Sequence, residues 1–599
     1  MQPTTEILAR IRGNSLANKD EAFTRLYRYM LRPDIYFVAY QNLYANNGAA
    51  TKGVNNDTAD GFSEAKIANI IRKLSDDSYR PTPVRRSHIA KKGNPKKKRP
   101  LGIPTFTDKL VQEALRMILE AVYEPVFLPV SHGFRPGKSC HTALKSVKLE
   151  FNGARWFVEG DIKGCFDNID HEVLIGLIRN KIKDARLIKL IYRFLKAGYL
   201  EDWKYHMTYS GCPQGGVVSP ILANIYLHEL DKFVMGLKAE YDTYSREPVT
   251  TEYRLLSNEV QMLSYYIGRA EGAEKERLLT EYRAKRKLML KTPCTAQTGK
   301  CIKYVRYADD FIIAVKGSKA DCQRIKARLS EFIAQSLKME LSDEKTLITH
   351  SGQRARFLGY DVRVRRNGLV RRGGPGHKTK RTLNGVCELS VPFHDKIHDF
   401  IFAKGVAEQK KDGTLFPVHR VSLLHLTDLE IISVYNAELR GICNYYGMAV
   451  DFYKLCYLGY LMEYSCLKTL AAKHKSSIAK IKAKFKDGKG RWGVPYETKA
   501  GSKRRCFVKY AECKGAANPT DIVSGAAFVH RYSRTTLEER LKAHVCELCG
   551  ATDSESYEIH HVNKVKNLKG KYKWEIAMIA KRRKTLVVCK KCHYAIHHP

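Results

Sequence analysis

No stretch of this 599-residue sequence has the roughly 18 consecutive apolar residues that a membrane-spanning helix requires, so we expect no transmembrane segment. The beginning of the chain also lacks the apolar core of a secretory signal peptide. Residues 1–30 contain arginine in an amphipathic pattern, but they include acidic residues, which argues against a transit peptide. These absences argue against a membrane partner and against secretion.

Acidic residues are scarce relative to basic ones. The sequence has 62 Asp and Glu residues against 104 Lys and Arg residues, which gives a formal net charge of +42. This charge indicates a polyanionic partner, with an affinity that falls steeply as the salt concentration rises. Ribosomal and chromatin-type proteins are also basic, but they rarely carry 44% hydrophobic and 10% aromatic residues over such a length. The length allows about three to five domains.

Sixteen cysteines in a chain without a secretion signal favour free thiols and metal ligands over disulfide bonds. Four of them form two Cys-x-x-Cys pairs, Cys546 with Cys549 and Cys589 with Cys592. Two such pairs are a strong indication of a tetrahedral structural zinc ion. Residues 550–588, between the pairs, leave room for an inserted element.

Two adjacent acidic residues, Asp309 and Asp310, interrupt an apolar sequence that runs from Lys303 to Val315. The pattern predicts a β-hairpin whose turn carries the acids. Neighbouring carboxylates repel each other unless a cation lies between them, and in-line phosphoryl transfer requires carboxylate-bound divalent ions. A solvated turn would explain an isolated Asp-Asp pair. A third acid at the end of an upstream apolar strand, Asp161, favours the metal site instead.

The strand that ends at Asp161 and the Tyr-Ala-Asp-Asp sequence at 307–310 resemble the palm of a reverse transcriptase. By this resemblance the magnesium-binding residues are Asp161, Ile162, Asp309 and Asp310, of which the three acids are catalytic. The resemblance places the deoxynucleotide pocket at Lys98, Arg99, Ile162, Phe166, Gln214 and Lys345. Phe166 corresponds to the aromatic gate that rejects a ribose 2′-OH, and Lys345 to a proton donor for pyrophosphate.

Two further segments match the same family in its order. Residues 132–139 (His-Gly-Phe-Arg-Pro-Gly-Lys-Ser) resemble a second basic segment of the fingers, and residues 357–360 (Phe-Leu-Gly-Tyr) resemble the primer grip. Each segment alone is weak evidence for the family, but together with the palm acids the segments are a very specific indication of it.

Residues 440–447 (Arg-Gly-Ile-Cys-Asn-Tyr-Tyr-Gly) follow a sequence with helical periodicity. Packing within a polymerase thumb would explain the aromatic residues. The string, however, resembles the maturase domain of group II intron-encoded proteins, which also serves as the thumb and binds intron RNA. The implied RNA-binding residues are Arg440, Asn444, Tyr445 and Tyr446. Lysines around Phe485 and Trp492 suit phosphate contacts and base stacking, although a solvated helix would explain any one lysine.

The histidines near the Cys pairs resemble an HNH endonuclease, a ββα-metal fold that cuts DNA with one divalent ion. By this resemblance His561 is the catalytic general base, for which imidazole has a suitable pKa. The nuclease metal ligands are then His560, His593 and His597. The family's usual Asn before the second Cys pair is absent from residues 584–588, so its role stays unassigned. A zinc-stapled DNA-binding module is the alternative.

Composition shifts divide the chain further, since residues 234–298 are polar and helical and residues 362–385 are rich in Gly, Lys and Arg. The expected parts are an N-terminal extension of the fingers (1–80), fingers and palm (81–361) with a helical insertion (234–298), a basic linker (362–388), a thumb and maturase domain (389–490), a DNA-binding region (491–540) and an HNH endonuclease domain (541–599).

Together these features resemble a group II intron-encoded protein over almost the full length. The resemblance implies a multidomain α+β fold, in which a right-hand polymerase carries an α-helical thumb and a zinc-stapled ββα-metal tail. It implies target-primed reverse transcription, assistance to intron splicing and nicking of target DNA. The expected cofactors are Mg²⁺ for the polymerase and nuclease and structural Zn²⁺. The expected partners are intron RNA, target DNA and deoxynucleoside triphosphates, in the bacterial cytoplasm or an organellar matrix; a homodimer stays open.

Two alternatives remain beside this hypothesis. A non-mobile reverse transcriptase of another class would lack the maturase string and the HNH tail. A splicing-only RNA-binding maturase would be favoured if one of the three palm acids were missing, and none is.

Overall fold

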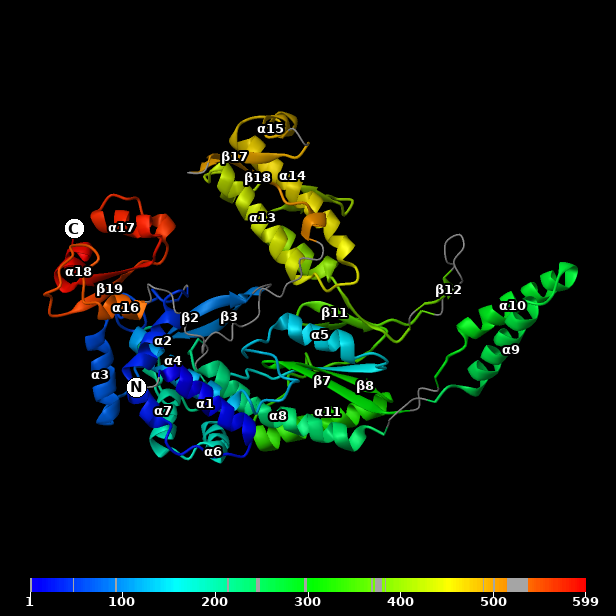
Figure 1. The fold of residues 1–599 in the computed structure, drawn as a ribbon, viewed down its shortest axis with the longest axis horizontal. Helices are drawn as coiled ribbons and strands as arrows, with labels where there is room; N and C mark the ends of the chain where they lie inside the picture. Colours follow the sequence, from blue (N-terminus) through cyan, green and yellow to red (C-terminus); the bar gives the residue numbers. More distant parts are fainter. Residues whose placement is uncertain are drawn as a thin grey trace.

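The computed structural model describes residues 3–46, 48–91, 94–212, 215–243, 248–295, 299–367, 370–371, 380–382, 384–487, 490–498, 501–513 and 537–598. A mixed α/β body carries a helical arm at one end, a mostly helical module above it and the C-terminal tail at the other end (Figure 1). None of the described helices is both long enough and apolar enough to cross a membrane.

The N-terminal part of the body is helical, as predicted for residues 1–80, and surrounds one buried helix. That helix, α4 (Phe106–Tyr123), begins at Thr105, whose side chain accepts a hydrogen bond from the backbone N–H of Asp108. It is buried on nearly all sides because several helices pack around it: α1 (Thr4–Ala17), α2 (Pro33–Leu43) and α8 (Ser219–Tyr241). Beside them lie α3 (Glu64–Ser75), α6 (His171–Lys181) and α7 (Ala185–Leu195).

The predicted fingers contain a four-stranded sheet in the order β3-β2-β5-β6. Its strands are β2 (Val84–Lys91), β3 (Asn94–Ile103), β5 (Tyr199–Glu201) and β6 (Lys204–His206). The hairpin of β2 and β3 brings Lys98 and Arg99 into an exposed position on this sheet.

The predicted palm is a four-stranded antiparallel sheet in the order β7-β8-β4-β9. Its strands are β4 (Trp156–Asp161), β7 (Cys301–Tyr307), β8 (Asp310–Lys316) and β9 (Ile348–His350). Alternate residues of β8 enter different cores, since Phe311 and Ile313 join the core beneath α8 and α11 (Lys319–Leu337), whereas Ile312 joins the core beneath α5 (Cys140–Glu150). Burial of both faces explains why this strand is continuously apolar.

A fully buried ion pair fastens the β7–β8 hairpin to α8. The guanidinium of Arg306 on β7 donates two hydrogen bonds to the carboxylate of Asp231, at 2.7 and 2.6 Å. The same guanidinium donates to the carbonyl of Ala308 at 2.8 Å and to Ser131 Oγ at 2.9 Å. Because Ala308 is the turn residue before Asp309 and has a φ of +55°, this contact fixes the turn that carries the acids.

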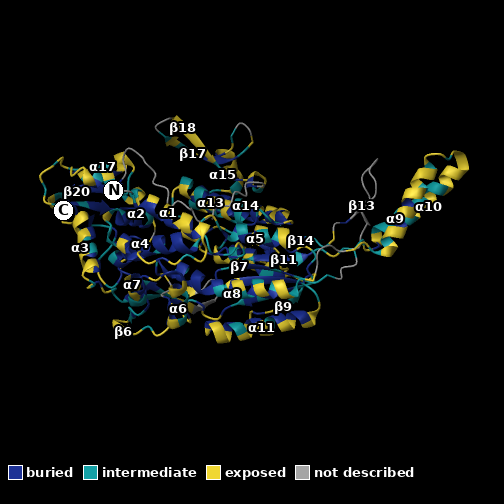
Figure 2. Ribbon diagram, turned by 60° about the horizontal axis from the view of Figure 1, so that its bottom comes forward, coloured by how far each residue is buried: buried dark blue, intermediate teal, exposed yellow. Residues whose placement is uncertain are grey.

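The predicted insertion forms an antiparallel helical arm of α9 (Thr251–Ile267) and α10 (Gly272–Lys291) that projects from the body (Figure 1). Figure 2 shows the arm as largely exposed, and α10 has no buried residue. The predicted start at residue 234 is too early, because α8 continues to Tyr241 and buries Val234 and Leu237 in the body.

A small sheet of β10 (Ala355–Phe357), β11 (Tyr360–Val364) and β14 (Cys387–Ser390) connects the palm to the helical module. The larger elements of this module are α13 (Asp428–Tyr445), α14 (Leu455–Lys473), α15 (Ile478–Lys484), β17 (Gly493–Thr498) and β18 (Gly501–Cys506). Smaller elements are β12 (Val370–Arg371), β13 (Lys380–Arg381), α12 (His398–Ala403), β15 (Ala407–Gln409) and β16 (Leu415–Pro417).

The start predicted for the DNA-binding region, residue 491, lies inside this module. Trp492 and Val494 are buried in its core, and Asn436 of α13 donates to the Cys506 carbonyl at 2.8 Å. The core of the predicted thumb and maturase domain therefore extends beyond residue 490 and includes the hairpin of β17 and β18.

The C-terminal tail contains α16 (Leu537–Lys542), β19 (Tyr557–His561), α17 (Lys573–Lys581), β20 (Thr585–Cys589) and α18 (Lys590–His597). The two strands and α18 give the expected ββα order. The tail is docked on the fingers extension, because β1 (Phe62–Ser63) pairs with β19 and completes the three-stranded sheet β1-β19-β20.

We predict that Arg306→Met will lower the free energy of unfolding by about 3–5 kcal/mol, because the Asp231 carboxylate would be left buried without its partner. Urea unfolding measures the change. The matched control is Arg328→Met, which removes an exposed ion pair with Glu240 whose side chains are 50% and 61% exposed. This control should cost less than about 1 kcal/mol. Equal losses in the two variants would contradict the role of the buried pair.

Candidate active sites

The palm hairpin places its acids at the end of the sheet, as the sequence predicts. Asp310 is the first residue of β8 and lies directly opposite Asp161, the last residue of β4. Asp309 occupies the turn between β7 and β8. The side chain of Ile162, the next residue, is buried. The backbone hydrogen bonds around it are made by its neighbours: Ser342 N–H donates to the Asp161 carbonyl, and Lys163 N–H donates to the Glu340 carbonyl.

The acids repel one another in the absence of a cation. Burial and the charges of Asp309 and Asp161 raise the pKa of Asp310 to about 7. Burial also raises the pKa of Asp309, against the lowering effect of Lys345 and Arg99. This donor set of hard carboxylate oxygens fits a divalent ion that relieves the repulsion.

Lys345 lies at the same site, although its side chain is 66% exposed. Its ammonium group lies 2.5 Å from Asp161 Oδ2, and this hydrogen bond raises the pKa of the lysine. The structure thus places Lys345 beside the palm acids, and its predicted role as a proton donor for pyrophosphate stays a prediction.

The predicted gate Phe166 is partly buried. Its ring meets the ring of Phe134 edge to face, with the centroids 6.3 Å apart. Its carbonyl accepts a hydrogen bond from the backbone N–H of Cys212 at 2.7 Å. Gly211 allows this close approach, since its φ is +89° and a Cβ there would lie 2.7 Å from the Asp167 carbonyl oxygen. Gln214, the other predicted pocket residue of this segment, lies outside the described residues.

The segment 132–139 supports the palm and does not offer its arginine to a ligand. Arg135 is buried, and its guanidinium bonds to the carboxylate of Glu124 and to two backbone carbonyls. Gly133 lies against the catalytic turn, where a Cβ would approach the backbone nitrogen of Ala308 to 2.3 Å. Within this segment, predicted to be a second basic segment of the fingers, Arg135 therefore has a structural role.

Two predicted RNA-binding tyrosines instead join the thumb to the primer-grip turn. The Tyr445 hydroxyl donates to the Leu358 carbonyl at 2.5 Å, and the Tyr446 hydroxyl donates to the Gly359 carbonyl at 3.2 Å. Both rings lie against the ring of Tyr360. Tyr446 is only 5% exposed, which corrects its assignment to direct RNA contact. Arg440 is exposed and Asn444 is partly exposed, so their RNA contacts stay predictions.

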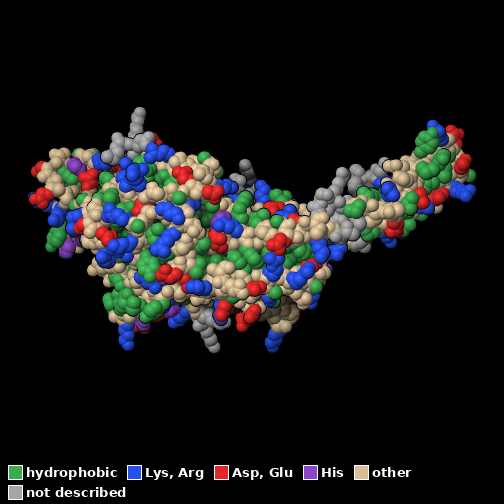
Figure 3. Space-filling model, turned by 90° about the horizontal axis from the view of Figure 1, so that it is seen from below, with side chains coloured by type: hydrophobic (Ala, Val, Ile, Leu, Met, Phe, Trp, Pro, Cys, Tyr) green, Lys and Arg blue, Asp and Glu red, His purple; other side chains and the backbone are tan. Residues whose placement is uncertain are grey.

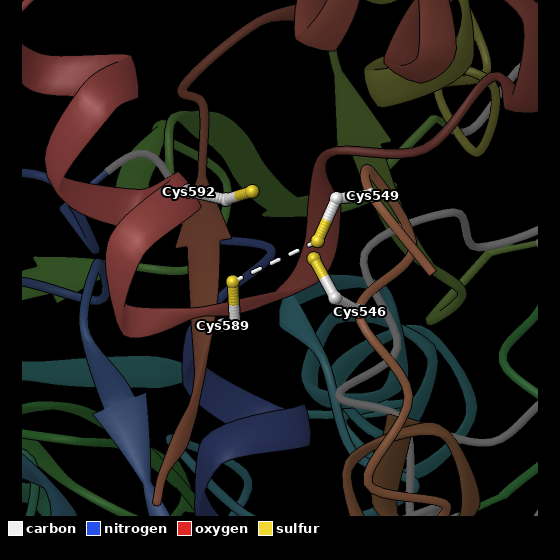
Figure 4. Close-up of side chains that lie close together, drawn as sticks. All are labelled: Cys546, Cys549, Cys589 and Cys592. Atoms are coloured by element: carbon white, nitrogen blue, oxygen red, sulfur yellow. Dashed lines mark hydrogen bonds between the residues drawn. The ribbon is translucent and has the colours of Figure 1, made fainter. Parts of the chain in front are cut away.

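The four predicted zinc ligands come together in the tail. Cys546 and Cys549 approach from the loop after α16, and Cys589 and Cys592 from the end of β20 and the start of α18 (Figure 4). Their sulfur atoms lie within 4.8 Å of one another, and the Cys549 and Cys589 sulfurs are 3.8 Å apart. A tetrahedral site with metal–sulfur bonds of about 2.3 Å has sulfur–sulfur edges of about 3.8 Å, so the donor set fits zinc.

The pKa of one of these thiols also favours metal binding. Burial opposes ionisation of Cys546, but hydrogen bonds from the backbone of Cys549, Cys589 and Leu548 outweigh it and lower the pKa of the thiol to about 7. Thiolate is the form of cysteine that binds metals.

A second compact set of metal-binding side chains contains one residue that the sequence did not suggest. The three predicted nuclease ligands His560, His593 and His597 gather with Asp60, and their ligand atoms lie within 4.8 Å of one another. Asp60 belongs to the fingers extension, about 500 residues away in the sequence, so no local pattern could have identified it. Among the described residues, the palm acids do not form such a compact set.

His561, the predicted general base, points to a different neighbour. Its side chain is 8% exposed, and Nε2 lies 3.1 Å from the carbonyl oxygen of Tyr44. Burial lowers its pKa, which keeps the imidazole neutral near pH 7 and thus able to accept a proton.

The basic residues are not confined to these sites. In Figure 3 lysine and arginine side chains are spread over the visible face of the body and are interspersed with acidic and apolar ones. Such a distribution favours extended contacts with a polyanion over a single anion-binding patch.

Models of three protein families match parts of the chain. They describe reverse transcriptase (RNA-dependent DNA polymerase) over residues 89–245, type II intron maturase over 386–522 and AI2M/AI1M-like HNH endonuclease over 546–593. The first match includes Asp161 and ends before the insertion, so Asp309 and Asp310 lie beyond it. The second extends past β18, in agreement with the packing of that hairpin.

Similar proteins cover different shares of the chain. "Group II intron-encoded protein LtrA" of Lactococcus lactis subsp. cremoris is 65% identical over 100% of both chains. An "uncharacterized 91 kDa protein in cob intron" of Schizosaccharomyces pombe is 35% identical over 95% of this chain and 69% of its own length. A solved apo telomerase from Candida tropicalis covers 47% of each chain at 12% identity and a TM-score of 0.31, which is too low to support a conclusion.

We predict that Asp310→Asn will raise the free energy of unfolding in metal-free buffer at pH 8, by less than about 1 kcal/mol because solvent screens the charge of this exposed carboxylate. The raised pKa means that the wild type loses stability as the pH rises from about 4 to about 7 and Asp310 ionises, whereas asparagine stays neutral. Urea unfolding at pH 5 and pH 8 should therefore give a larger difference at pH 8. Asp343→Asn, at an exposed acid near Lys345, is the control. A gain that is equal at both pH values would contradict the repulsion.

Proposed function

Because the chain belongs to the group II intron-encoded proteins, we propose that it copies intron RNA into DNA by target-primed reverse transcription, assists splicing of that RNA and nicks target DNA with its tail. The observation that carries the proposal is the facing pair Asp161 and Asp310 in a palm sheet to which a maturase module is joined. A splicing-only protein would not need three acids in such mutual repulsion.

In the polymerase, Asp161, Asp309 and Asp310 would hold Mg²⁺. When bound, the ions supply the positive charge that activates the primer hydroxyl and neutralises the leaving pyrophosphate. The protein's own groups prepare the site around them. Lys98 and Arg99, which are exposed on the β2–β3 hairpin, would bind the triphosphate. The ring of Phe166 excludes a 2′-OH, and Lys345 donates a proton to the pyrophosphate.

The order of events at Lys345 follows from its contact with Asp161. Without a nucleotide, its ammonium group neutralises part of the acidic cluster. Asp161 would also hold a divalent ion, which would supply the positive charge that Lys345 now gives to this carboxylate. The ammonium group of Lys345, 66% exposed, would then be able to contact the triphosphate.

In the tail, Zn²⁺ bound by Cys546, Cys549, Cys589 and Cys592 serves as a structural staple. His560, His593 and His597 would hold the nuclease ion, and His561 takes the proton of the attacking water. The net charge of +42 favours binding to polyanions, and target DNA and intron RNA are the polyanions that the protein binds. Arg440 and Asn444, on the accessible side of α13, contact the intron RNA.

We predict that Asp309→Asn will reduce primer extension on an RNA template by at least about 100-fold, because it removes a ligand needed for phosphoryl transfer. Splicing of the bound intron should continue at the wild-type rate. The two activities are measured on the same purified ribonucleoprotein, with Asp343→Asn as a control that retains both. Primer extension at the wild-type rate in Asp309→Asn would show that the palm assignment is wrong.

We also predict that Cys589→Ser will lose one zinc ion per chain and abolish nicking by the tail, because a closed Cys₄ site stabilises the fold around it. Primer extension and splicing should persist, since their residues lie in the body and the thumb. Cys456→Ser, at an exposed cysteine outside the cluster, is the control. Metal analysis and a nicking assay test the two variants, and retention of zinc by Cys589→Ser would refute the assignment.

A further inference from the structure

Asp60 contacts all three histidines of the tail from the fingers extension. Its Oδ1 atom lies 3.2 Å from His560 Nδ1, and its Oδ2 atom lies 2.8 Å from His597 Nε2 and 3.3 Å from His593 Nε2. One carboxylate therefore faces three imidazole nitrogens from two separate elements of the tail.

The histidines have the arrangement of ligands rather than of ordinary buried polar groups. His560 is 4% exposed, its Nδ1 atom has the Asp60 carboxylate as its polar neighbour, and its Nε2 atom has no hydrogen-bond partner among the described residues. A buried ring nitrogen without a hydrogen bond is costly unless something else uses its lone pair.

His593 is oriented by a second carboxylate. Its Nδ1 atom bonds to Glu558 of β19, while its Nε2 atom faces Asp60 and His597. A carboxylate on the far nitrogen commonly fixes the tautomer and direction of a metal-binding histidine. Glu558 thus orients His593 so that its other ring nitrogen, Nε2, faces the centre of the cluster.

Backbone pairing holds Asp60 in this position. Its Oδ1 atom accepts a hydrogen bond from the His561 N–H at 2.7 Å, and the next residue, Gly61, donates to the Ile559 carbonyl at 3.0 Å. The pairing of β1 with β19 continues this contact. Asp60 is therefore fixed to the same strand that carries His560.

We propose that Asp60 is a fourth protein ligand of the nuclease cation and closes that site against DNA. Three imidazoles and one carboxylate suit a tetrahedral transition-metal ion better than the Mg²⁺ expected from the sequence. For a tetrahedral ion, three protein ligands leave an open position, whereas four protein ligands close the site. The Asp60 carboxylate occupies the position that a phosphate oxygen of the DNA needs. The inference rests on the proposed nuclease function of the tail and adds a regulation to it.

The docked position also covers His561. Its Nε2 atom faces the Tyr44 carbonyl, which belongs to the fingers extension as Asp60 does. A movement of the tail away from the extension therefore withdraws Asp60 from the histidines and exposes His561 at the same time. The nuclease is therefore closed while the tail lies on the fingers extension, and it opens when a DNA phosphate displaces Asp60. Cutting by the tail is in this way restricted to complexes in which DNA has separated the two parts.

The test uses the full-length chain with zinc in the Cys₄ site and titrates Co²⁺ as a visible-light probe of the histidine site. Asp60→Asn keeps an oxygen that accepts from the His561 N–H but loses the charge. We expect at least about tenfold weaker Co²⁺ binding and a loss of the four-coordinate absorption. Nicking of duplex DNA at saturating Co²⁺ should rise several-fold. Unchanged primer extension would show that the variant is folded.

The matched control is Glu64→Gln, which removes an exposed ion pair to His544 of the tail at 3.0 Å without touching the histidine cluster. It should leave Co²⁺ affinity unchanged. Wild-type Co²⁺ affinity in Asp60→Asn, or weaker binding without faster nicking, would overturn the closing role of Asp60. His593→Ala separates this from the proposed function: if it also binds Co²⁺ normally, the nuclease site itself is misassigned.

Discussion

The geometry of the polymerase site depends on one buried ion pair. Asp309 lies on a turn whose residue Ala308 has a left-handed conformation, next to Asp310 and opposite the end of the strand that carries Asp161, so the three carboxylates repel one another across this turn. Arg306 opposes this repulsion by bonding at once to Asp231 on α8 and to the Ala308 carbonyl. A helix that is deep in the body thus determines where the catalytic carboxylates lie. An arginine is required because its planar fork can serve both partners simultaneously.

The second organising contact joins the two ends of the chain. The tail is a separate zinc-stapled unit by sequence, yet its sheet is completed by β1 of the fingers extension. Asp60 and His544 add polar contacts across the same boundary. The polymerase and the nuclease are therefore physically connected through the extension, and a change in one can alter the other.

Sequence patterns were sufficient for features with strong local signals. The Tyr-Ala-Asp-Asp hairpin, the strand that ends at Asp161 and the two Cys-x-x-Cys pairs were predicted because period, spacing and residue type agree within a few residues. Residues defined by long-range packing were missed. Asp231 resembles an ordinary helix surface residue, although the charged Arg306 within an apolar strand was a usable sign of a buried pair. Tyr446 was assigned to RNA because its motif does not show that its ring faces the palm, and Asp60 has no local signal at all.

The pairing of β1 with β19 has a consequence for biosynthesis. During translation the fingers extension leaves the ribosome first, whereas Tyr557–His561 is made near the end of the 599 residues. Domains generally fold in the order of their synthesis. The strand edge formed by Phe62 and Ser63 therefore stays unpaired while the polymerase and thumb are synthesised and fold. A chain that terminates before β19 therefore exposes this edge to other chains.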